Sequence, residues 1–248
     1  VIGVAQEPAS RPRRVIIKTV SSKKAVSPKP RPLTRFELTE AEFQLAALGY
    51  WLKRADGLWD ESSRHALTAF QKVENLPLTG KLTRDVYEHL LFARRPEPRE
   101  DGPAHIEVDL RRQVLFIVND EARVTHVLPV STGSGEEFTS EGWTRDAITP
   151  PGRFNVQRKI AGWHKSPLGM MYFPNYLFLG LAIHGSESIP TKPASHGCVR
   201  VPMFAAAELA KLMPKDTPVV VYDGLTPFVS FRLITPMRWR ALDVRASN

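Results

Sequence analysis

The sequence predicts a multidomain α and β protein: a small bundle of three helices, followed by a domain of mainly antiparallel strands with one or two helices. Two patterns predict this division. Residues 36–95 repeat apolar side chains at helical spacing, whereas residues 104–223 contain short alternating or apolar runs between polar turns. We expect a linker at 96–103, a basic Pro-rich arm at 1–35 and a tail at 224–248.

The arm carries the net charge of the chain. The 248 residues include 34 Lys and Arg and 26 Asp and Glu, a formal net charge of +8, and residues 1–35 hold nine of the basic and one of the acidic residues. Such an arm is either a solvated tether or a binding segment for anionic lipid or wall polymer. Because it lacks aromatic side chains that stack on bases, we expect no nucleic acid partner.

Two short segments of the arm have predictions of their own. Arg14–Val20 is expected to form one strand. Residues 1–5 resemble the end of a signal peptide, with small residues at the cleavage positions. An ordinary segment without a targeting role explains them about equally well.

Three helices are predicted in residues 36–95: about Leu38 to Gly49, Asp60 to Glu74 and Thr83 to Phe92. Thr39 and Glu42 have the spacing of a capping box at the start of the first helix. The run AALGYWLKRADGLWDESSRHALTAFQKVENLPLTGKL at 46–82 resembles the peptidoglycan-binding type 1 repeat, in which LGY, DG, Ala-x-x-x-Phe-Gln and Leu-Pro-x-x-Gly recur. This resemblance implies that the bundle either binds glycan or wall polymer or serves as a spacer.

The strands of the second domain are predicted from short apolar runs. The first three, which are expected to form antiparallel hairpins, are His105–Leu110, Gln113–Val118 and Ala122–Val130. Later elements are a strand at Leu177–Ile183, a short strand ended by Pro202, a helix at Met203–Met213 and a strand at Thr217–Tyr222. The long polar segment Ser131–Pro151 is expected to be functional or mobile, and to cap a cleft.

Cys198 is the only cysteine, and its surroundings point to a chemical role. His184 lies fourteen positions upstream, directly after the apolar run Leu177–Ile183. A thiol with a pKa of about 8.5 is a poor nucleophile at neutral pH, whereas a neighbouring imidazole shifts it toward the thiolate. We therefore expect the loop 185–194 to fold back and bring Cys198 beside His184.

Other classes of protein fit less well. A lone cysteine is about as often an inert buried side chain as a nucleophile. A papain-like protease has its cysteine before its histidine, the reverse of the order here. A zinc peptidase needs clustered ligands such as His-Glu-x-x-His, and the seven histidines show no such spacing. We expect neither a metal nor a cofactor.

The run HGSESIPTKPASHGCVR at His184–Arg200 resembles the signature of the L,D-transpeptidase, or YkuD, family: a histidine, a spacer of about this length, Ser/Thr-His-Gly-Cys, a hydrophobic residue, then Arg or Asn. VSTG at Val130–Gly133 and TPPGRF at Thr149–Phe154 are similar to the strand ends that frame the family's active site. The resemblance covers about residues 104–223 and implies a β-sandwich catalytic domain.

The resemblance implies an enzyme that forms 3→3 cross-links in peptidoglycan. Cys198 would take the acyl group of a tetrapeptide donor stem, releasing D-alanine, and pass it to the amine of an acceptor stem. His184 is the implied base, and the backbone N–H groups of Gly197 and Cys198 are the implied oxyanion donors. His196 either tunes the thiolate or packs inside the loop. An L,D-carboxypeptidase would use the same residues with water as the acceptor, and a non-catalytic wall-binding protein would leave the motif unexplained.

The predicted substrate-binding residues are Ser195, Arg200, Tyr172 and Gly185. Arg200 can pair with a substrate carboxylate or form a structural salt bridge. Some family members carry a hydroxyl residue directly after the first histidine, where this chain has Gly185, so a backbone carbonyl or Ser186 is expected to orient His184. The resemblance also implies carbapenem-type β-lactams as covalent inhibitors of Cys198, and a bacterial protein that acts outside the cytoplasm, secreted or associated with the wall.

Overall fold

The computed structural model describes residues 31–140 and 142–224. The basic arm up to residue 30, with its expected strand and signal-peptide segment, lies outside the described residues, as does the tail from residue 225. None of the helices in the described ranges is both long enough and apolar enough to cross a membrane.

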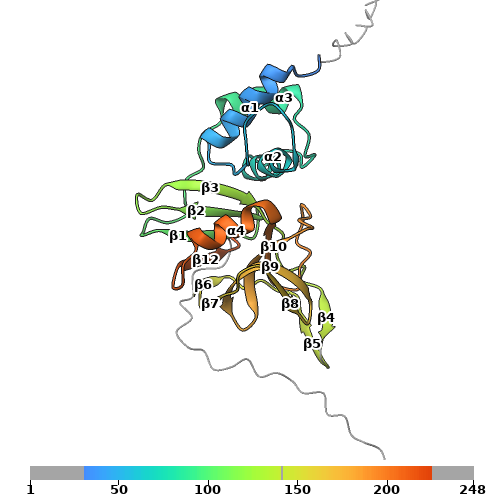
Figure 1. Cartoon of the computed structure of the whole chain (residues 1–248), viewed down its shortest axis with the longest axis vertical. Coiled ribbons are helices and arrows are strands. Elements are labelled where there is room, and N and C mark those ends of the chain that lie inside the picture. Colours follow the sequence, from blue (N-terminus) through green and yellow to red (C-terminus); the bar gives the residue numbers. More distant parts are fainter. Residues whose placement is uncertain (1–30, 141, 225–248) are drawn as a thin grey trace, which may run out of the picture. The chain divides into compact units, whose positions relative to one another are not determined.

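Three helices precede the strands and confirm the predicted bundle (Figure 1). They are α1 (Arg35–Ala47), α2 (Glu61–Val73) and α3 (Arg84–Phe92). The second and third begin where their caps dictate: the Asp60 side chain accepts from the Ser63 N–H, and the Thr83 hydroxyl accepts from the Val86 N–H.

The predicted start of the first helix is wrong. The capping box is formed by Thr34 and Glu37, whose side chains each accept from the backbone N–H of the other. Thr39 lies inside the helix, where its hydroxyl donates to the Arg35 carbonyl. Glu42 is fully buried and binds the loop that follows α1. The same four-residue spacing occurs twice here, and only the earlier copy lies at the helix end.

The strands form two larger sheets and a separate two-stranded hairpin, which confirms the predicted fold class of a helical bundle followed by a mainly antiparallel sandwich. The first sheet has the order β3-β2-β1-β12-β6. Its strands are β1 (His105–Asp109), β2 (Val114–Val118), β3 (Val124–Pro129), β6 (Gly152–Asn155) and β12 (Pro218–Tyr222). The β1–β12 pair is parallel, and the other pairs of this sheet are antiparallel.

The second sheet has the order β11-β10-β9-β7, with β8 also paired to β9. Its strands are β7 (Arg158–Lys159), β8 (Trp163–Ser166), β9 (Gly169–Phe178), β10 (Leu181–Ser186) and β11 (Val199–Pro202). The helix α4 (Met203–Leu212) contacts β9, β10 and β11. The β10–β11 pair is parallel, so the segment between these strands crosses back along the sheet.

Two sequence predictions need correction here. Leu177–Ile183 is not one strand, because the chain reverses at Leu179 and Gly180, both with positive φ, between β9 and β10. Ser131–Pro151 contains an antiparallel hairpin of β4 (Glu137–Ser140) and β5 (Trp143–Asp146). The first turn lies inside an apolar run, so no polar residue marks it in the sequence. The hairpin is polar and exposed, so its sequence shows little of the alternation that indicates a strand.

The strand β2 lies between two apolar cores. Leu115 and Ile117 pack into the sandwich core with residues of β10, β11 and α4, whereas Phe116 and Val118 pack with the three N-terminal helices. Successive side chains of a strand point to opposite faces, so burial on both faces explains the unbroken apolar sequence. The helices therefore share a core with the outer face of this sheet.

Backbone hydrogen bonds also join the helical part to the edge of the first sheet. The Trp51 N–H donates to the Val127 carbonyl, and the Val127 N–H donates to the Gly49 carbonyl. This pairing gives β3 a partner on the edge that would otherwise be unpaired. Side chains and main chain together hold α2 against β2 and β3 (Figure 1).

Candidate active site

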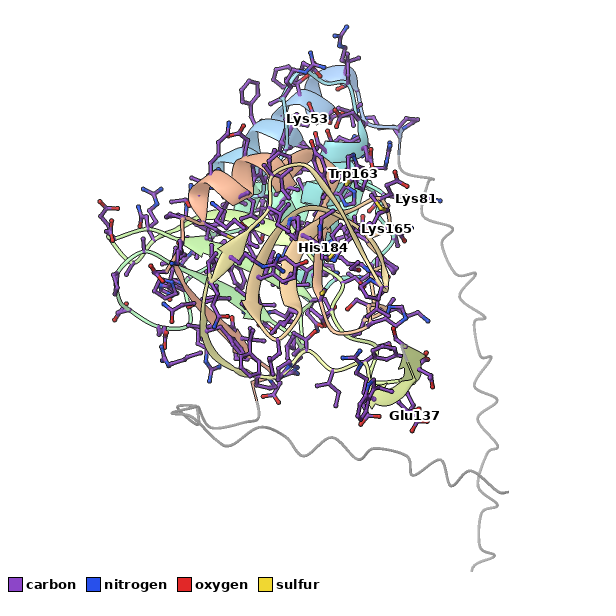
Figure 2. All side chains as sticks on the ribbon, turned by 60° about the horizontal axis from the view of Figure 1, so that its bottom comes forward. Lys53, Lys81, Glu137, Trp163, Lys165 and His184 are labelled. Carbon is purple, nitrogen blue, oxygen red and sulfur yellow. The ribbon has the colours of Figure 1, made fainter. Side chains whose placement is uncertain are left out.

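Two adjacent parallel strands carry the residues of the predicted catalytic pair. In the register of β10 and β11, Ile183 lies opposite Val199 and His184 opposite Arg200, and Cys198 directly precedes β11. Because side chains alternate along a strand, Cys198, His184 and Arg200 all belong to one face of this sheet. Figure 2 shows His184 among the strands of the fold.

The packing supports this assignment of faces. Ile183 and Val199 lie in the sandwich core, on the side covered by α4. Cys198 instead packs with a small cluster of Met171, Tyr176 and Ala182. The thiol therefore lies on the face of the second sheet that is turned away from the main core.

One hydrogen bond determines which nitrogen of the His184 ring can act as a base. Nδ1 lies 2.9 Å from the Gly185 carbonyl oxygen, which can only accept, so Nδ1 carries the proton and Nε2 is the unprotonated nitrogen. Burial lowers the pKa of His184, and the Arg200 charge lowers it further, against the opposing effect of the carbonyl. The imidazole is thus neutral at pH 7 and able to take a proton. Of the two expected orienting groups, the structure has the backbone carbonyl.

Gly185 is required by packing against α4. A Cβ at this position would lie 2.7 Å from the Ala206 Cβ, closer than real Cβ contacts allow, and 3.2 Å from the Tyr172 Cβ, which is tighter than most such contacts. A hydroxyl side chain after the histidine has no room here. The Gly185 carbonyl alone orients His184.

The surroundings of Cys198 differ from the expected thiolate environment. Burial raises the pKa of the thiol, while a backbone hydrogen bond from Ala182 and the Arg200 charge act in the opposite direction. The Sγ atom lies 3.5 Å from the Gly180 carbonyl oxygen, and no hydrogen bond in the described ranges joins it to His184. At rest, the pair is a neutral thiol and a neutral imidazole, so a proton must transfer during attack.

The backbone before Cys198 is held by buried hydroxyl groups. The Ser195 hydroxyl donates to the Cys198 carbonyl at 2.6 Å and accepts from the Gly197 N–H at 3.0 Å. The Thr149 hydroxyl donates to the Gly197 carbonyl at 2.5 Å and accepts from the Gly133 N–H. Gly197 has φ +127°, which other residues rarely adopt. These bonds fix the loop from both sides.

Those bonds bear on two predicted roles. Ser195 is buried and its hydroxyl is engaged within the loop. The Gly197 N–H, expected to receive an oxyanion, donates to Ser195 in this conformation. The substrate role of Ser195 and the oxyanion role of Gly197 and Cys198 stay predictions.

His196 is exposed and touches the polar hairpin. Its ring lies 4.8 Å from the ring of Phe138 in β4, centroid to centroid. The Arg145 guanidinium lies over the same Phe138 ring, 5.4 Å from its centroid. The hairpin thus contacts the loop that carries Cys198. This contact is with the hairpin and not inside the loop, so both expected roles of His196 stay predictions.

A pocket of about 680 Å³ lies at Arg200, the residue opposite His184 in the register of β10 and β11. It is lined by Trp163, Met170, Ser186, Glu187, Ser188 and Arg200. Arg200 is one of these lining residues, and it forms no ion pair within the described residues. Tyr172 is not among the residues that line the pocket; it packs against the sandwich core, and its ring lies 5.0 Å from the ring of Trp163, centroid to centroid. Its substrate role stays a prediction.

Residues 103–221 match the family model described as the L,D-transpeptidase catalytic domain, YkuD. A crystal structure of the L,D-transpeptidase from Xylanimonas cellulosilytica is 38% identical, with a TM-score of 0.73, over 79% of this chain and 100% of that chain. The chain belongs to the YkuD family of L,D-transpeptidases. This membership confirms the predicted resemblance.

Other comparisons are weaker. Residues 37–90 of this YkuD protein match the model described as "Putative peptidoglycan binding domain". The L,D-transpeptidase of Stackebrandtia nassauensis is 22% identical, with a TM-score of 0.44, over 75% of this chain and 90% of that chain. No curated protein matches the chain. The two family matches overlap the two predicted domains, whose boundaries stay predictions.

Sequence reasoning missed several residues of the site. Thr149 lies within the TPPGRF motif, but the motif does not indicate that its hydroxyl binds the Gly197 carbonyl. Trp163, Met170 and Glu187 line the pocket from a hairpin and a loop whose positions depend on strand pairing. No short-range pattern in the sequence identifies them.

Proposed function

We propose that this YkuD family member forms 3→3 cross-links between peptidoglycan stems through a thioester on Cys198. The Cys198 Sγ attacks the carbonyl after the third residue of a tetrapeptide donor while His184 Nε2 takes the thiol proton. The carbon–nitrogen bond to D-alanine then breaks, and His184 returns the proton to the leaving amine.

The second half of the reaction reverses these roles. The side-chain amine of an acceptor stem attacks the thioester carbonyl, His184 Nε2 takes the amine proton, and the thiol is released with it. The observation that carries the proposal is the neutral His184, whose Nδ1–H donates to the Gly185 carbonyl and so leaves Nε2 as the nitrogen that can accept a proton. A neutral thiol beside a neutral imidazole needs such proton transfer.

The substrate surface proposed for the donor is the pocket at Arg200. Arg200 lines this pocket with a guanidinium suited to a stem carboxylate, and Trp163 and Met170 add apolar surface. Carbapenem-type β-lactams would acylate the same sulfur. We also propose that the helical domain binds wall polymer and that the protein acts outside the cytoplasm, where its substrate lies.

The test is incubation of the purified protein with disaccharide tetrapeptide, followed by mass spectrometry of the products. Cross-linked dimers with loss of D-alanine are expected. Tripeptide without dimers would instead identify an L,D-carboxypeptidase, and unchanged substrate would favour a wall-binding protein. The Cys198→Ala variant should give no product, and turnover in that variant would contradict the thioester.

A further inference from the structure

Lys72, near the end of α2, is an almost fully buried lysine that donates into the catalytic domain. Its side chain is 5% exposed, and Nζ lies 2.9 Å from the Gln113 carbonyl oxygen and 3.0 Å from the Val130 carbonyl oxygen. Lysines are rarely buried to this extent, because the ammonium group loses its hydration. In this chain the cost is offset by bonds to two backbone groups that come from different segments.

Those two segments lead directly to the catalytic loop. The Gln113 side chain donates from Nε2 to the Thr132 hydroxyl at 2.7 Å, and its Oε1 accepts from the Thr132 N–H at 2.9 Å. The Thr132 carbonyl then accepts from the N–H groups of Ala194 and Ser195, both at 2.9 Å. Ser195 in turn bonds the Cys198 carbonyl. Each link is a hydrogen bond of ordinary length between buried or half-buried groups.

Gln113 occupies an unusual backbone conformation that this set of bonds maintains. Its φ is +56°, in the left-handed region that residues other than glycine seldom adopt. Its carbonyl accepts from both Lys72 and the Val130 N–H, and Nε2 also donates to the Leu110 carbonyl. Such a conformation persists where the surroundings determine it. Loss of the Lys72 donor removes one of those constraints.

We propose that Lys72 is a positioning residue for the catalytic loop, and that it acts through Gln113 and Thr132 on the backbone of Ser195 and Cys198. The inference rests on the proposed function for its effect on turnover. It assigns the helical domain a second role beside wall binding, since one of its helices supports the geometry of the loop that carries the nucleophile.

The charge state of Lys72 does not decide this role. Burial lowers the pKa of Lys72 to about 7, so the amine is partly neutral at physiological pH. An ammonium group has three N–H donors and a neutral amine has two, and two suffice for the Gln113 and Val130 carbonyls. Burial lowers the pKa of His65, which lies on the preceding turns of α2, and the Lys72 charge contributes to that lowering. The bonds therefore persist across the neutral range.

The test compares Lys72→Met with Lys81→Met, a matched change at an exposed lysine of the same helical domain (Figure 2). Lys72→Met is expected to lower kcat about 10-fold with KM for the donor stem changed less than about 2-fold, because a displaced loop weakens catalysis more than binding. Lys81→Met should match the wild-type protein in both. Equal kcat in the two variants would overturn the proposal.

Two readouts do not depend on the proposed function. In Lys72→Met, hydrogen exchange at the Ala194 and Ser195 amides should become faster, and the rate of alkylation of Cys198 by iodoacetamide should change, relative to Lys81→Met. Unchanged exchange and alkylation would contradict the inference even if the protein proved to have another activity. Absence of cross-linking together with faster exchange would instead contradict the proposed function and uphold the role of Lys72.

A second variant serves if Lys72→Met does not fold. Gln113→Glu keeps the acceptor for the Thr132 N–H but lacks the amide donor to the Thr132 hydroxyl and the Leu110 carbonyl. The same selective loss of kcat and the same faster exchange at Ala194 and Ser195 are expected. Wild-type values for both quantities would rule out the path from Lys72 to the loop.

Discussion

Two loops in this protein are held by buried polar side chains, with different consequences. In the helical domain the Glu42 carboxylate accepts from the N–H groups of Asp56 and Gly57 and from the Ser63 hydroxyl. In the catalytic domain the Ser195 hydroxyl holds the backbone of Gly197 and Cys198. The first set of bonds connects residues of the helical domain only, whereas the second reaches the backbone of the proposed nucleophile. Similar local physics thus supports stability in one loop and chemistry in the other.

The largest expected effect comes from removing His184, the proposed general base. His184→Ala should lower kcat by about 10²–10⁴-fold, because a positioned acid–base group contributes about that much. Steady-state kinetics with the tetrapeptide donor measures it, with Cys198→Ala as the inactive reference. A kcat within a few-fold of wild type would remove His184 from the proposed role.

Glu42→Gln should affect only stability. The change weakens three hydrogen bonds that a buried carboxylate accepts, and bonds to charged groups contribute about 1.5–3 kcal/mol each, so a loss of about 2 kcal/mol in the free energy of unfolding is expected. Denaturant unfolding measures the loss. A large fall in kcat per folded molecule would show that the two loops are not separate in function.

Ser195→Ala should show the opposite pattern. The unfolding free energy should fall by about 1 kcal/mol, while kcat falls about 10-fold as the backbone at Gly197 and Cys198 loses its fixed geometry. The same two measurements applied to Glu42→Gln and Ser195→Ala separate stability from catalysis. Equal effects of both variants on kcat would contradict the distinction.

The smallest effect concerns the charge of Arg200. This charge lowers the pKa of both His184 and Cys198, so Arg200→Gln should raise both. The acid limb of kcat/KM, which reports protonation of His184 and lies below the ordinary histidine value of about 6.5, should move to higher pH. The midpoint of thiol alkylation, which lies above about 8.5, should also rise. Shifts in opposite directions would show that Arg200 does not act on both groups.

Sequence patterns predicted the elements whose signals are local. Caps and apolar stripes located α2 and α3, and the alternation and turns located β1 to β3. The continuous apolar sequence of β2 followed from burial on both faces. The family resemblance assigned Cys198, His184 and the two flanking motifs to one site. The structure places Thr132 and Thr149 of those motifs against the catalytic loop.

The remaining features depend on contacts between distant residues. The turn at Leu179 and Gly180 lies inside an apolar run, so no polar residue marked it. The neutral state of the thiol follows from burial on the face shared with Met171 and Ala182, which strand pairing creates. Lys72 lies on a predicted helix, but no pattern in the sequence indicates that its amine donates to the Gln113 and Val130 carbonyls. Sequence spacing carries no information on such pairings.

The most direct test of the account is to trap the acyl-enzyme. The protein is mixed with the tetrapeptide donor without an acceptor, quenched in acid, and digested for peptide mass mapping. The account predicts a tripeptide adduct, joined as a thioester, on the peptide that contains Cys198, lost in Cys198→Ala and formed much more slowly in His184→Ala. Product formation with an adduct on another residue, or with none in wild-type protein under single-turnover conditions, would contradict it.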